Sequence, residues 1–350
     1  MVVFAWIDAT VCAKLPSMSA PPTQHVPSFP QSARSVSTAP RGAGYTPDLV
    51  FSTQAYLYMR DALARELDAT IGHIEHRTFP DGERYQRIEE DVAGRDIALV
   101  GGTISDPDTL ELYDLACTMV KAGARSLVLI VPYFGYATME RAIRAGEVVT
   151  AKTRARLLSS IPNGDAPNHM LLFDVHTEGL AYYFEGTIVP IHVYGKPIVL
   201  SLARELVGPH GDLVLACTDA GRAKWVESLA NDLGVPPSFV FKRRLDGERT
   251  NITAVSAQVE DKDVVIYDDM IRTGGSLMQA AEAYRAAGAR TISAIATHGL
   301  FPGDSLERIS KSGLFQTIAC TDSHPRALSL AGPHLRVEPT AHLFAAALRA

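Results

Sequence analysis

Cysteine is scarce in this sequence and is not clustered. The chain has four cysteines, at Cys12, Cys117, Cys217 and Cys320, with no Cys-x-x-Cys pair and no cluster of His and Cys. This spacing argues against a disulfide framework and against a zinc site. It fits a protein of a reducing compartment, so we expect a cytoplasmic location.

An excess of basic charge and long apolar runs are also missing. Lysine and arginine number 33 against 39 aspartates and glutamates, which gives a net charge of −6. A nucleic-acid partner is therefore not expected, because proteins that bind nucleic acid carry a basic surface. No apolar run approaches the roughly 20 residues that cross a bilayer, so no membrane partner is expected either.

The chain has 350 residues, 47% of them hydrophobic, which suits about two globular domains. Residues 1–46 differ from the rest, because they are rich in Pro, Ser, Ala and Thr and hold one acidic residue, Asp8. We interpret them as a disordered extension. A translation start at Met18 and a transit peptide are the alternatives.

Strands and helices are predicted to alternate from about residue 48 onward. Short apolar runs rich in Val, Ile and Leu are typical of strands buried on both faces of a parallel sheet. We expect strands at Ile97–Val100, Ser126–Val131, Met170–Phe173, Asp212–Ala216, Val264–Tyr267 and Thr291–Thr297, and helices at Asp108–Ala122, Thr150–Ser160, Arg222–Leu233 and Ser276–Ala287.

This alternation predicts an α/β fold with two doubly wound parallel-sheet domains. We expect one domain over 47–198 and the other over 199–327, with a C-terminal helical segment, 328–350, packed on the first. Gly-Ala-Arg precedes a predicted strand twice, at Gly123 and at Gly288, which hints at an internal duplication.

The segment Val264–Leu277 carries the most specific chemistry. A predicted strand leads into Asp268 and Asp269, and a loop and a helix follow. Two adjacent glycines let the backbone approach an anion, hydroxyl side chains surround it, and the helix N-terminus favours negative charge. The carboxylates suit sugar hydroxyls or a hydrated Mg²⁺. The expected ligand is thus a sugar phosphate, bound beyond the carboxyl end of a strand.

This segment resembles the ribose-phosphate motif shared by phosphoribosyltransferases and ribose-phosphate pyrophosphokinases. The resemblance implies phosphoribosyltransferase-type domains. It also assigns binding of ribose 5-phosphate to Asp268, Asp269, Arg272, Thr273, Gly274, Gly275 and Ser276.

Further blocks, all in the expected order, resemble the pyrophosphokinase branch. They include "FPDGERY" (Phe79–Tyr85), "LLFDVHTEGL" (Leu171–Leu180), "CTDAGRAKW" (Cys217–Trp225) and "FKRR" (Phe241–Arg244). The resemblance implies transfer of the β,γ-diphosphoryl group of ATP to the anomeric hydroxyl of ribose 5-phosphate. It assigns ATP binding to Phe79, Asp81, Glu83, Arg141 and His176, and binding of a Mg²⁺ cofactor to His176 and Asp219. It assigns catalysis to Lys242 and Arg244, which begin a polar stretch that we interpret as a lid.

The same resemblance implies a homo-oligomer based on dimers, with hexamers known in the family, because Phe79–Glu83 serves the ATP of a neighbouring subunit. Three departures stand out. Thr138 and Met139 replace an Arg-Gln pair for ATP, as in a plant-type subgroup. Asp91 and Ala93 replace a phosphate-binding pair, so we expect little activation by phosphate. The metal segment ends in Arg222 rather than in a second glycine. A phosphoribosyltransferase and a non-catalytic regulatory homologue remain as alternatives.

Overall fold

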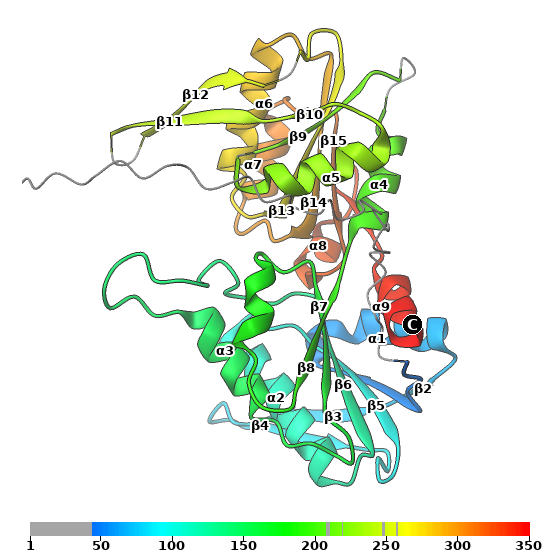
Figure 1. The fold of residues 1–350 in the computed structure, drawn as a ribbon. Helices are drawn as coiled ribbons and strands as arrows, with labels where there is room; N and C mark the ends of the chain where they lie inside the picture. Colours follow the sequence, from blue (N-terminus) through cyan, green and yellow to red (C-terminus); the bar gives the residue numbers. More distant parts are fainter. Residues whose placement is uncertain (1–43, 208–210, 219, 247–248, 257) are drawn as a thin grey trace, which may run out of the picture. The chain divides into compact units, whose positions relative to one another are not determined.

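The computed structural model describes residues 44–207, 211–218, 220–246, 249–256 and 258–350, with the backbone alone at 220, 241–246 and 249–254. In these ranges two six-stranded sheets have every strand pair parallel. Helices flank each sheet (Figure 1). The α/β class with two doubly wound parallel sheets is thereby confirmed.

The first sheet has the strand order β2-β1-β5-β6-β7-β8. Its strands are β1 (Leu49–Ser52), β2 (Thr70–Ile71), β5 (Asp96–Val100), β6 (Ser126–Val131), β7 (His169–Phe173) and β8 (Val189–Val193). The main helices of this half are α1 (Leu57–Leu67), α2 (Asp106–Lys121) and α3 (Thr150–Ser159). A short 3₁₀ segment, Gln54–Tyr56, leads into α1, and another, Glu178–Tyr183, follows β7.

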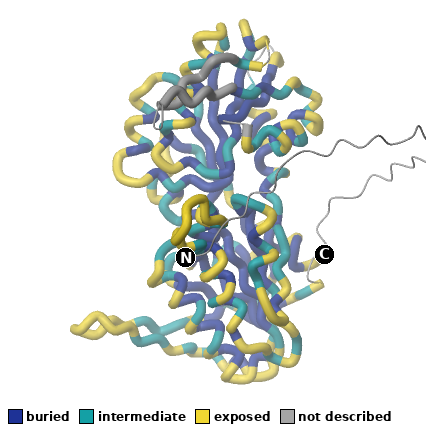
Figure 2. Tube along the Cα trace, turned by 60° about the vertical axis from the view of Figure 1, so that its left-hand side comes forward, coloured by how far each residue is buried: buried dark blue, intermediate teal, exposed yellow. Residues whose placement is uncertain are grey.

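Strand residues alternate between two apolar layers, as the period of two requires. Leu49 and Phe51 of β1 pack with Leu112 of α2, whereas Val50 packs with Leu63 of α1. Both sets are fully buried, and the strands are dark blue in Figure 2. The side chain of Ser105 accepts a hydrogen bond from the backbone N–H of Asp108, which caps the start of α2.

The second sheet has the order β10-β9-β13-β14-β15-β16. Its strands are β9 (Leu213–Cys217), β10 (Pro237–Ser238), β13 (Asp263–Ile271), β14 (Thr291–Gly299), β15 (Thr317–Thr321) and β16 (Arg336–Glu338). The helices are α4 (Lys196–Glu205), α5 (Ala223–Leu233), α6 (Gly275–Ala286), α7 (Ser305–Lys311) and α8 (Pro325–Leu330), with a 3₁₀ turn at Ala220–Arg222.

The last helix, α9 (Ala341–Arg349), belongs to the core of the first half. Phe344 and Leu348 are fully buried in the same apolar cluster as Leu63 of α1. The ring of Phe344 lies 5.4 Å from that of Phe173 at the end of β7. The backbone N–H of Tyr45 donates to the carbonyl of Leu348. Most of the predicted N-terminal extension, residues 1–43, lies outside the described residues.

Two hairpins complete the described part of the chain. One is formed by β3 (Ile74–Thr78) and β4 (Arg84–Ile88), and the other by β11 (Val240–Asp246) and β12 (Arg249–Val255). The polar stretch that we predicted as a lid therefore contains a β-hairpin. None of the helices in the described ranges combines the length and the apolar character needed to cross a bilayer.

The predicted strands and helices are found near their expected bounds, with two differences. The predicted C-terminal helical segment, 328–350, is not a single helix, because Arg336–Glu338 pairs with β15 as strand β16, and α9 alone packs in the core of the first half.

The second difference affects the site. We expected a strand to end at Tyr267, with the two aspartates between that strand and the following loop. The structure extends β13 to Ile271, so Asp268 and Asp269 are strand residues, and Asp268 pairs with Ala296 of β14. The reason is that β14 is equally long and offers backbone partners beyond Tyr267.

The two Gly-Ala-Arg tripeptides occupy matching places in the two sheets. Gly123 and Gly288 follow helices α2 and α6 with φ of +93° and +89°. Arg125 then pairs with Asp96, the first residue of β5, and Arg290 pairs with Asp263, the first residue of β13. With the identical topology of the sheets, these contacts support an internal duplication.

In this correspondence Gly101 and Gly102 of the first half match Asp268 and Asp269 of the second. A side chain has no room at either glycine. A Cβ at Gly101 would lie 2.8 Å from Leu112, and one at Gly102 would lie 2.3 Å from the hydroxyl oxygen of Tyr56. Tyr56 in turn donates a hydrogen bond to the carbonyl of Ser323, 2.9 Å away. The first half is thus closed where the second half opens.

Candidate active site

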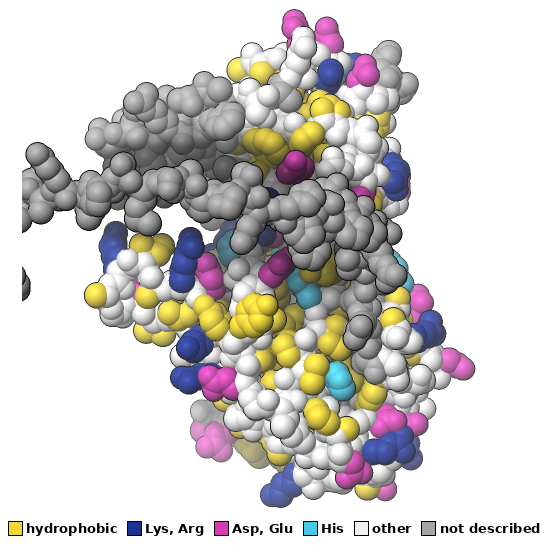
Figure 3. Space-filling view, viewed as in Figure 1, with side chains coloured by type: hydrophobic (Ala, Val, Ile, Leu, Met, Phe, Trp, Pro, Cys, Tyr) yellow, Lys and Arg dark blue, Asp and Glu magenta, His cyan; other side chains and the backbone are white. Residues whose placement is uncertain are grey.

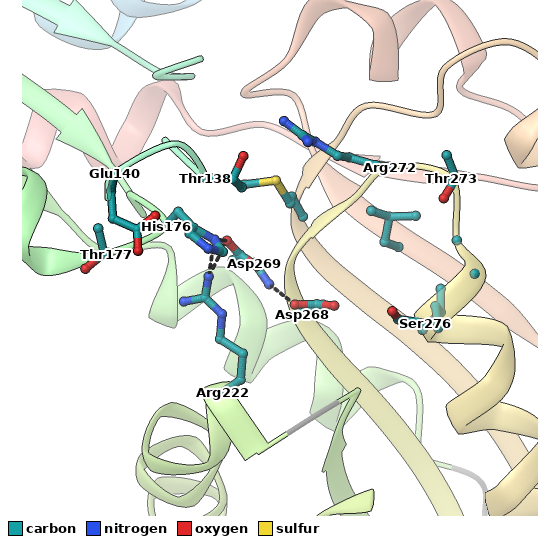
Figure 4. Close-up of a pocket in the computed structure, with 16 residues that line it drawn as sticks. Thr138, Glu140, His176, Thr177, Arg222, Asp268, Asp269, Arg272, Thr273 and Ser276 are labelled. Carbon is teal, nitrogen blue, oxygen red and sulfur yellow. Dashed lines mark hydrogen bonds and ion pairs between the residues drawn. The ribbon is translucent and has the colours of Figure 1, made fainter. Parts of the chain in front are cut away.

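A pocket of about 490 Å³ lies beyond the carboxyl end of β13. Its lining combines the β13–α6 connection with segments that follow β6, β7 and β9 (Figure 4). The lining residues are Thr138, Glu140, His176, Thr177, Gly221, Arg222 and the continuous run from Asp268 to Leu277. All seven residues predicted to bind ribose 5-phosphate therefore line one pocket, and His176 joins them.

The two aspartates of β13, buried Asp269 and partly buried Asp268, have opposite pKa shifts. Burial and the neighbouring negative charge of Asp269 raise the pKa of Asp268 to about 7. Burial also disfavours the charged form of Asp269, but the hydrogen bond from His176 and the charge of Arg222 outweigh it and lower the pKa of Asp269. The pair therefore holds one firmly ionised carboxylate beside one that binds a proton more readily.

Asp268 is held in place from both sides. Its Oδ2 accepts a hydrogen bond from the hydroxyl of Thr218, at 2.8 Å, and its Oδ1 accepts one from the backbone N–H of Asp269, at 2.9 Å. Thr218 directly follows β9, the neighbour of β13 in the sheet. The carboxyl ends of two adjacent strands thus fix the orientation of one carboxylate.

Asp269 meets two partners from distant parts of the chain. The Nδ1 atom of His176 lies 2.6 Å from Oδ2 of Asp269. Arg222 forms an ion pair with the same carboxylate oxygen and lies 2.7 Å from Nδ1 of His176. Figure 4 shows the guanidinium directed at both groups. His176 follows β7, and Arg222 ends the turn after β9, so three strand ends build this contact.

The loop after β13 has the geometry of an anion site. Gly274 has φ of +77°, and α6 begins at Gly275, so the backbone N–H groups of the first turn face the pocket side of the helix. A Cβ at Gly274 would lie 2.3 Å from Cδ1 of Ile309, whereas one at Gly275 would meet nothing within 4 Å. The side chains of Thr273 and Ser276 flank this turn in Figure 4.

Other predicted residues lie apart from this pocket. Phe79 is 47% exposed on the β3–β4 hairpin, where its ring packs edge-on against Tyr85. Asp81 accepts a hydrogen bond from the backbone N–H of Glu83 within the same turn. Arg141 does not line the pocket; its side chain is 77% exposed and forms an ion pair with Glu140. The ATP-binding roles of these residues stay predictions.

The predicted catalytic and metal residues are only partly described. Lys242 and Arg244 lie on β11, where their backbones pair with Ile252 and Thr250. Their side chains and the whole of Asp219 lie outside the described residues. In the described part of the chain, no group of three or more His, Cys, Asp or Glu side chains is arranged to hold a metal ion.

Sequence analysis did not assign three groups that the structure brings to the pocket. Glu140 and the side chain of Arg222 line it, whereas Thr218 lies outside the lining and donates a hydrogen bond to Asp268. Arg222 stood out only as a departure in the metal segment, and its length lets it reach across to β13.

Acidic and basic side chains are interspersed on the face shown in Figure 3.

Comparison with known proteins places the chain in a family. Residues 49–161 match the N-terminal domain of ribose phosphate pyrophosphokinase, and residues 229–350 match a phosphoribosyl synthetase-associated domain. The chain is 31% identical to ribose-phosphate pyrophosphokinase from Gloeobacter violaceus, over 85% of this chain and 88% of that protein. The chain belongs to the ribose-phosphate pyrophosphokinase family.

Other members of the ribose-phosphate pyrophosphokinase family are similarly related. The enzyme from Porphyromonas gingivalis is 31% identical, with 86% of this chain and 93% of that protein covered. Ribose-phosphate pyrophosphokinase 1 from Oryza sativa, described as chloroplastic, is 30% identical, with 84% and 73% covered. The crystal structure of phosphoribosylpyrophosphate synthetase from Mycobacterium smegmatis matches with a TM-score of 0.75 and 26% identity, over 86% of this chain and 98% of that one. The predicted family is confirmed.

Proposed function

We propose that this chain transfers the β,γ-diphosphoryl group of ATP to the anomeric hydroxyl of ribose 5-phosphate, which gives phosphoribosyl pyrophosphate and AMP. One observation carries the proposal. A single pocket joins the acidic pair of β13, a glycine-containing loop at a helix N-terminus, and a histidine that follows a strand of the other sheet. This arrangement suits a ligand with a phosphate at one end and hydroxyl groups at the other.

We assign the sugar phosphate to the β13–α6 side of the pocket. The N-terminal turn of α6, with Thr273 and Ser276, binds the 5-phosphate, because unpaired N–H groups and hydroxyls donate to its oxygens. Asp268 and Asp269 accept hydrogen bonds from the ribose hydroxyls. Held at both ends, the sugar presents its anomeric hydroxyl to the other side of the pocket, where His176 and Arg222 lie.

The reaction itself is a displacement at phosphorus. The anomeric oxygen forms a bond to the β-phosphorus of ATP while the bond from that phosphorus to the oxygen of the α-phosphate breaks. AMP leaves with that electron pair, and the hydroxyl proton is released. The protein contributes position and positive charge rather than a covalent bond. We assign the neutralisation of the developing charge to Lys242 and Arg244, brought in by the β11–β12 hairpin as a lid.

Mg²⁺ is the cofactor that we propose, carried by the phosphates of ATP and contacted by His176 and Asp219. The donor chemistry supports His176, because imidazole and carboxylate groups bind divalent ions and Nδ1 is already engaged by Asp269, which directs Nε2 to this role. When bound, the ion neutralises the triphosphate and polarises its phosphorus–oxygen bonds.

We further propose a homo-oligomer built from dimers, in which Phe79, Asp81 and Glu83 bind the ATP of a neighbouring subunit. The exposure of Phe79 on a projecting hairpin supports this, since a large apolar ring in water is a candidate for contact with a partner. We also propose a cytoplasmic location, which the scattered cysteines support.

The test is a coupled measurement of products. Purified protein is incubated with Mg²⁺, ATP and ribose 5-phosphate, and AMP and phosphoribosyl pyrophosphate are quantified together. We expect equimolar products that require the sugar and need no nucleobase. A Lys242→Ala variant should lose turnover with little change in the KM of either substrate. A folded oligomer that forms no monophosphate from ATP, GTP or CTP would instead indicate a regulatory homologue.

A further inference from the structure

The guanidinium of Arg222 contacts two other side chains of the pocket, Asp269 and His176. Its guanidinium forms an ion pair with Oδ2 of Asp269 and lies 2.7 Å from Nδ1 of His176. Nδ1 of His176 and Oδ2 of Asp269 are themselves only 2.6 Å apart. The Arg222 side chain is 19% exposed and that of Asp269 is 7% exposed, so the contact is largely shielded from water.

The atoms that surround this guanidinium are the kind that bind a divalent cation. Carboxylate oxygen and imidazole nitrogen are both metal ligands, and a second carboxylate, Asp268, is adjacent in the strand. A buried carboxylate needs a positive partner, because the cost of removing it from water is several kcal/mol or more. Arginine meets this need permanently, since its guanidinium does not lose its proton in proteins.

A fixed cation and a metal ion at this position exclude each other. Any ion that bridged Nδ1 of His176 and Oδ2 of Asp269 would have to displace the guanidinium that already contacts both atoms. Displacement would move Arg222 away from its counter-ion and would bring two cations close together, which is unfavourable at low local dielectric. The described donors of the free protein therefore do not fit a resident metal ion.

We propose that Arg222 is a built-in cation that takes the place of a divalent metal ion at the His176–Asp269 pair. The free protein accordingly binds no divalent ion there, and metal enters the site only as the nucleotide complex. The entry of metal with the nucleotide rests on the proposed function. The absence of a bound divalent ion at this pair concerns the free protein alone and is tested without any assay of activity.

The experiment is a titration of the purified protein with Mn²⁺, without nucleotide or sugar, followed by electron paramagnetic resonance of the unbound ion. Wild type is compared with Arg222→Met, which removes the charge and keeps most of the volume, and with Arg222→Gly, which opens the position. Lys224→Met is the matched control. It removes one positive charge two residues further on, from an exposed side chain outside the pocket lining.

We expect Arg222→Met and Arg222→Gly to bind Mn²⁺ at least about tenfold more tightly than wild type, because each uncovers a carboxylate and an imidazole as ligands. Lys224→Met should bind like wild type. Arg222→Lys, which keeps a cation, should also stay close to wild type. Adding His176→Ala to Arg222→Met should abolish the gained affinity. Thermal unfolding of each variant shows whether it is folded.

Three outcomes would overturn the proposal. The first is a Mn²⁺ site in the free wild-type protein that both His176→Ala and Asp269→Ala remove, a result that needs no Arg222 variant to fold. The second is equal Mn²⁺ affinity in wild type and Arg222→Met. The third is a gain that persists after His176 is removed, since the ion would then lie elsewhere. Failure of the product assay described above would leave all three measurements valid, so the two proposals fail separately.

Discussion

The imidazole of His176 and the carboxylate of Asp269 lie 2.6 Å apart across 93 residues of sequence. His176 follows a strand of the first sheet, and Asp269 lies near the carboxyl end of a strand of the second. This contact ties the two halves of the chain together at the place where the substrates are proposed to meet. The geometry of the acidic pair therefore depends on both halves.

The first prediction concerns Asp269. Asp269→Ala removes a carboxylate that accepts from the sugar hydroxyls in our proposal. Hydrogen bonds to charged groups contribute about 1.5–3 kcal/mol, so we expect the KM for ribose 5-phosphate to rise by about tenfold to a hundredfold. Steady-state kinetics measure this, and circular dichroism checks the fold. The control is Asp304→Ala, an aspartate whose side chain is 70% exposed on the surface. Unchanged kinetics in Asp269→Ala would remove the residue from the sugar site.

The second prediction compares adjacent glycines. Gly274→Ala places a Cβ at φ of +77° and within 2.3 Å of Ile309. We expect a loss of about 2 kcal/mol or more in the free energy of unfolding, together with weaker binding of ribose 5-phosphate. Gly275→Ala has open space in the first turn of α6, so its unfolding free energy should stay within about 0.5 kcal/mol of wild type. Urea denaturation separates the two. Equal stability of the variants would contradict the strained geometry at Gly274.

The third prediction uses the duplicated Arg–Asp pair. Asp263 is 1% exposed, so Arg290→Ala deprives a buried carboxylate of its cation and should cost about 2–3 kcal/mol of stability. Arg125 is 51% exposed and Asp96 23% exposed, so the matching Arg125→Ala change should cost less than about 1 kcal/mol. Urea denaturation of both variants provides the comparison. Similar losses would show that burial does not set the strength of these pairs.

The fourth prediction concerns His298, which is 2% exposed and which burial keeps neutral. Nδ1 of His298 lies 2.8 Å from the hydroxyl of Ser323, and Nε2 lies 3.2 Å from the carbonyl of Asp174. Burial lowers the pKa of His298 to about 4, against 6.5 for an exposed histidine. The unfolded chain therefore takes up the proton first as pH falls, and the stability contributed by His298 is present above about pH 6.5 and is lost toward pH 4.

The measurement compares wild type with His298→Gln, which keeps polar groups at this position and does not titrate. Groups that do not interact with His298 titrate alike in both proteins, so their effects cancel in the difference. We expect the stability advantage of wild type to shrink by about 2 kcal/mol between about pH 7 and pH 5. Parallel pH profiles of the two proteins in urea denaturation would show that His298 does not carry this dependence.

The strands were predictable because their apolar runs are short and rich in Val, Ile and Leu. The end of one helix was predictable because glycine, here Gly288, readily adopts the positive φ that follows a helix. The sugar-phosphate loop was predictable for a local reason, since Asp268 to Ser276 are consecutive and act together. The partners of the acidic pair, in contrast, were not predictable from the sequence. Arg222 and Thr218 reach the acidic pair through the pairing of β9 with β13, and a single sequence does not show which strands are neighbours.

The extension of β13 past Tyr267 was missed for a related reason. Aspartates are unfavourable inside strands, so a local pattern ends the strand before Asp268. The length of β14 decides otherwise, because its backbone supplies partners up to Gly299. Long-range pairing of this kind overrides local preference wherever a neighbouring strand continues.

The closed first half places a different constraint on the matching positions of the two sheets. At the position of the acidic pair it has Gly101 and Gly102, covered by Leu112 and Tyr56, and Tyr56 bonds to Ser323 of the other half. The first half thus makes a protein contact at the place where the second half lines the pocket. Packing therefore restricts Gly101 and Gly102 in the first half, whereas the ligand restricts Asp268 and Asp269 in the second, and the first half contributes to the pocket through His176 instead.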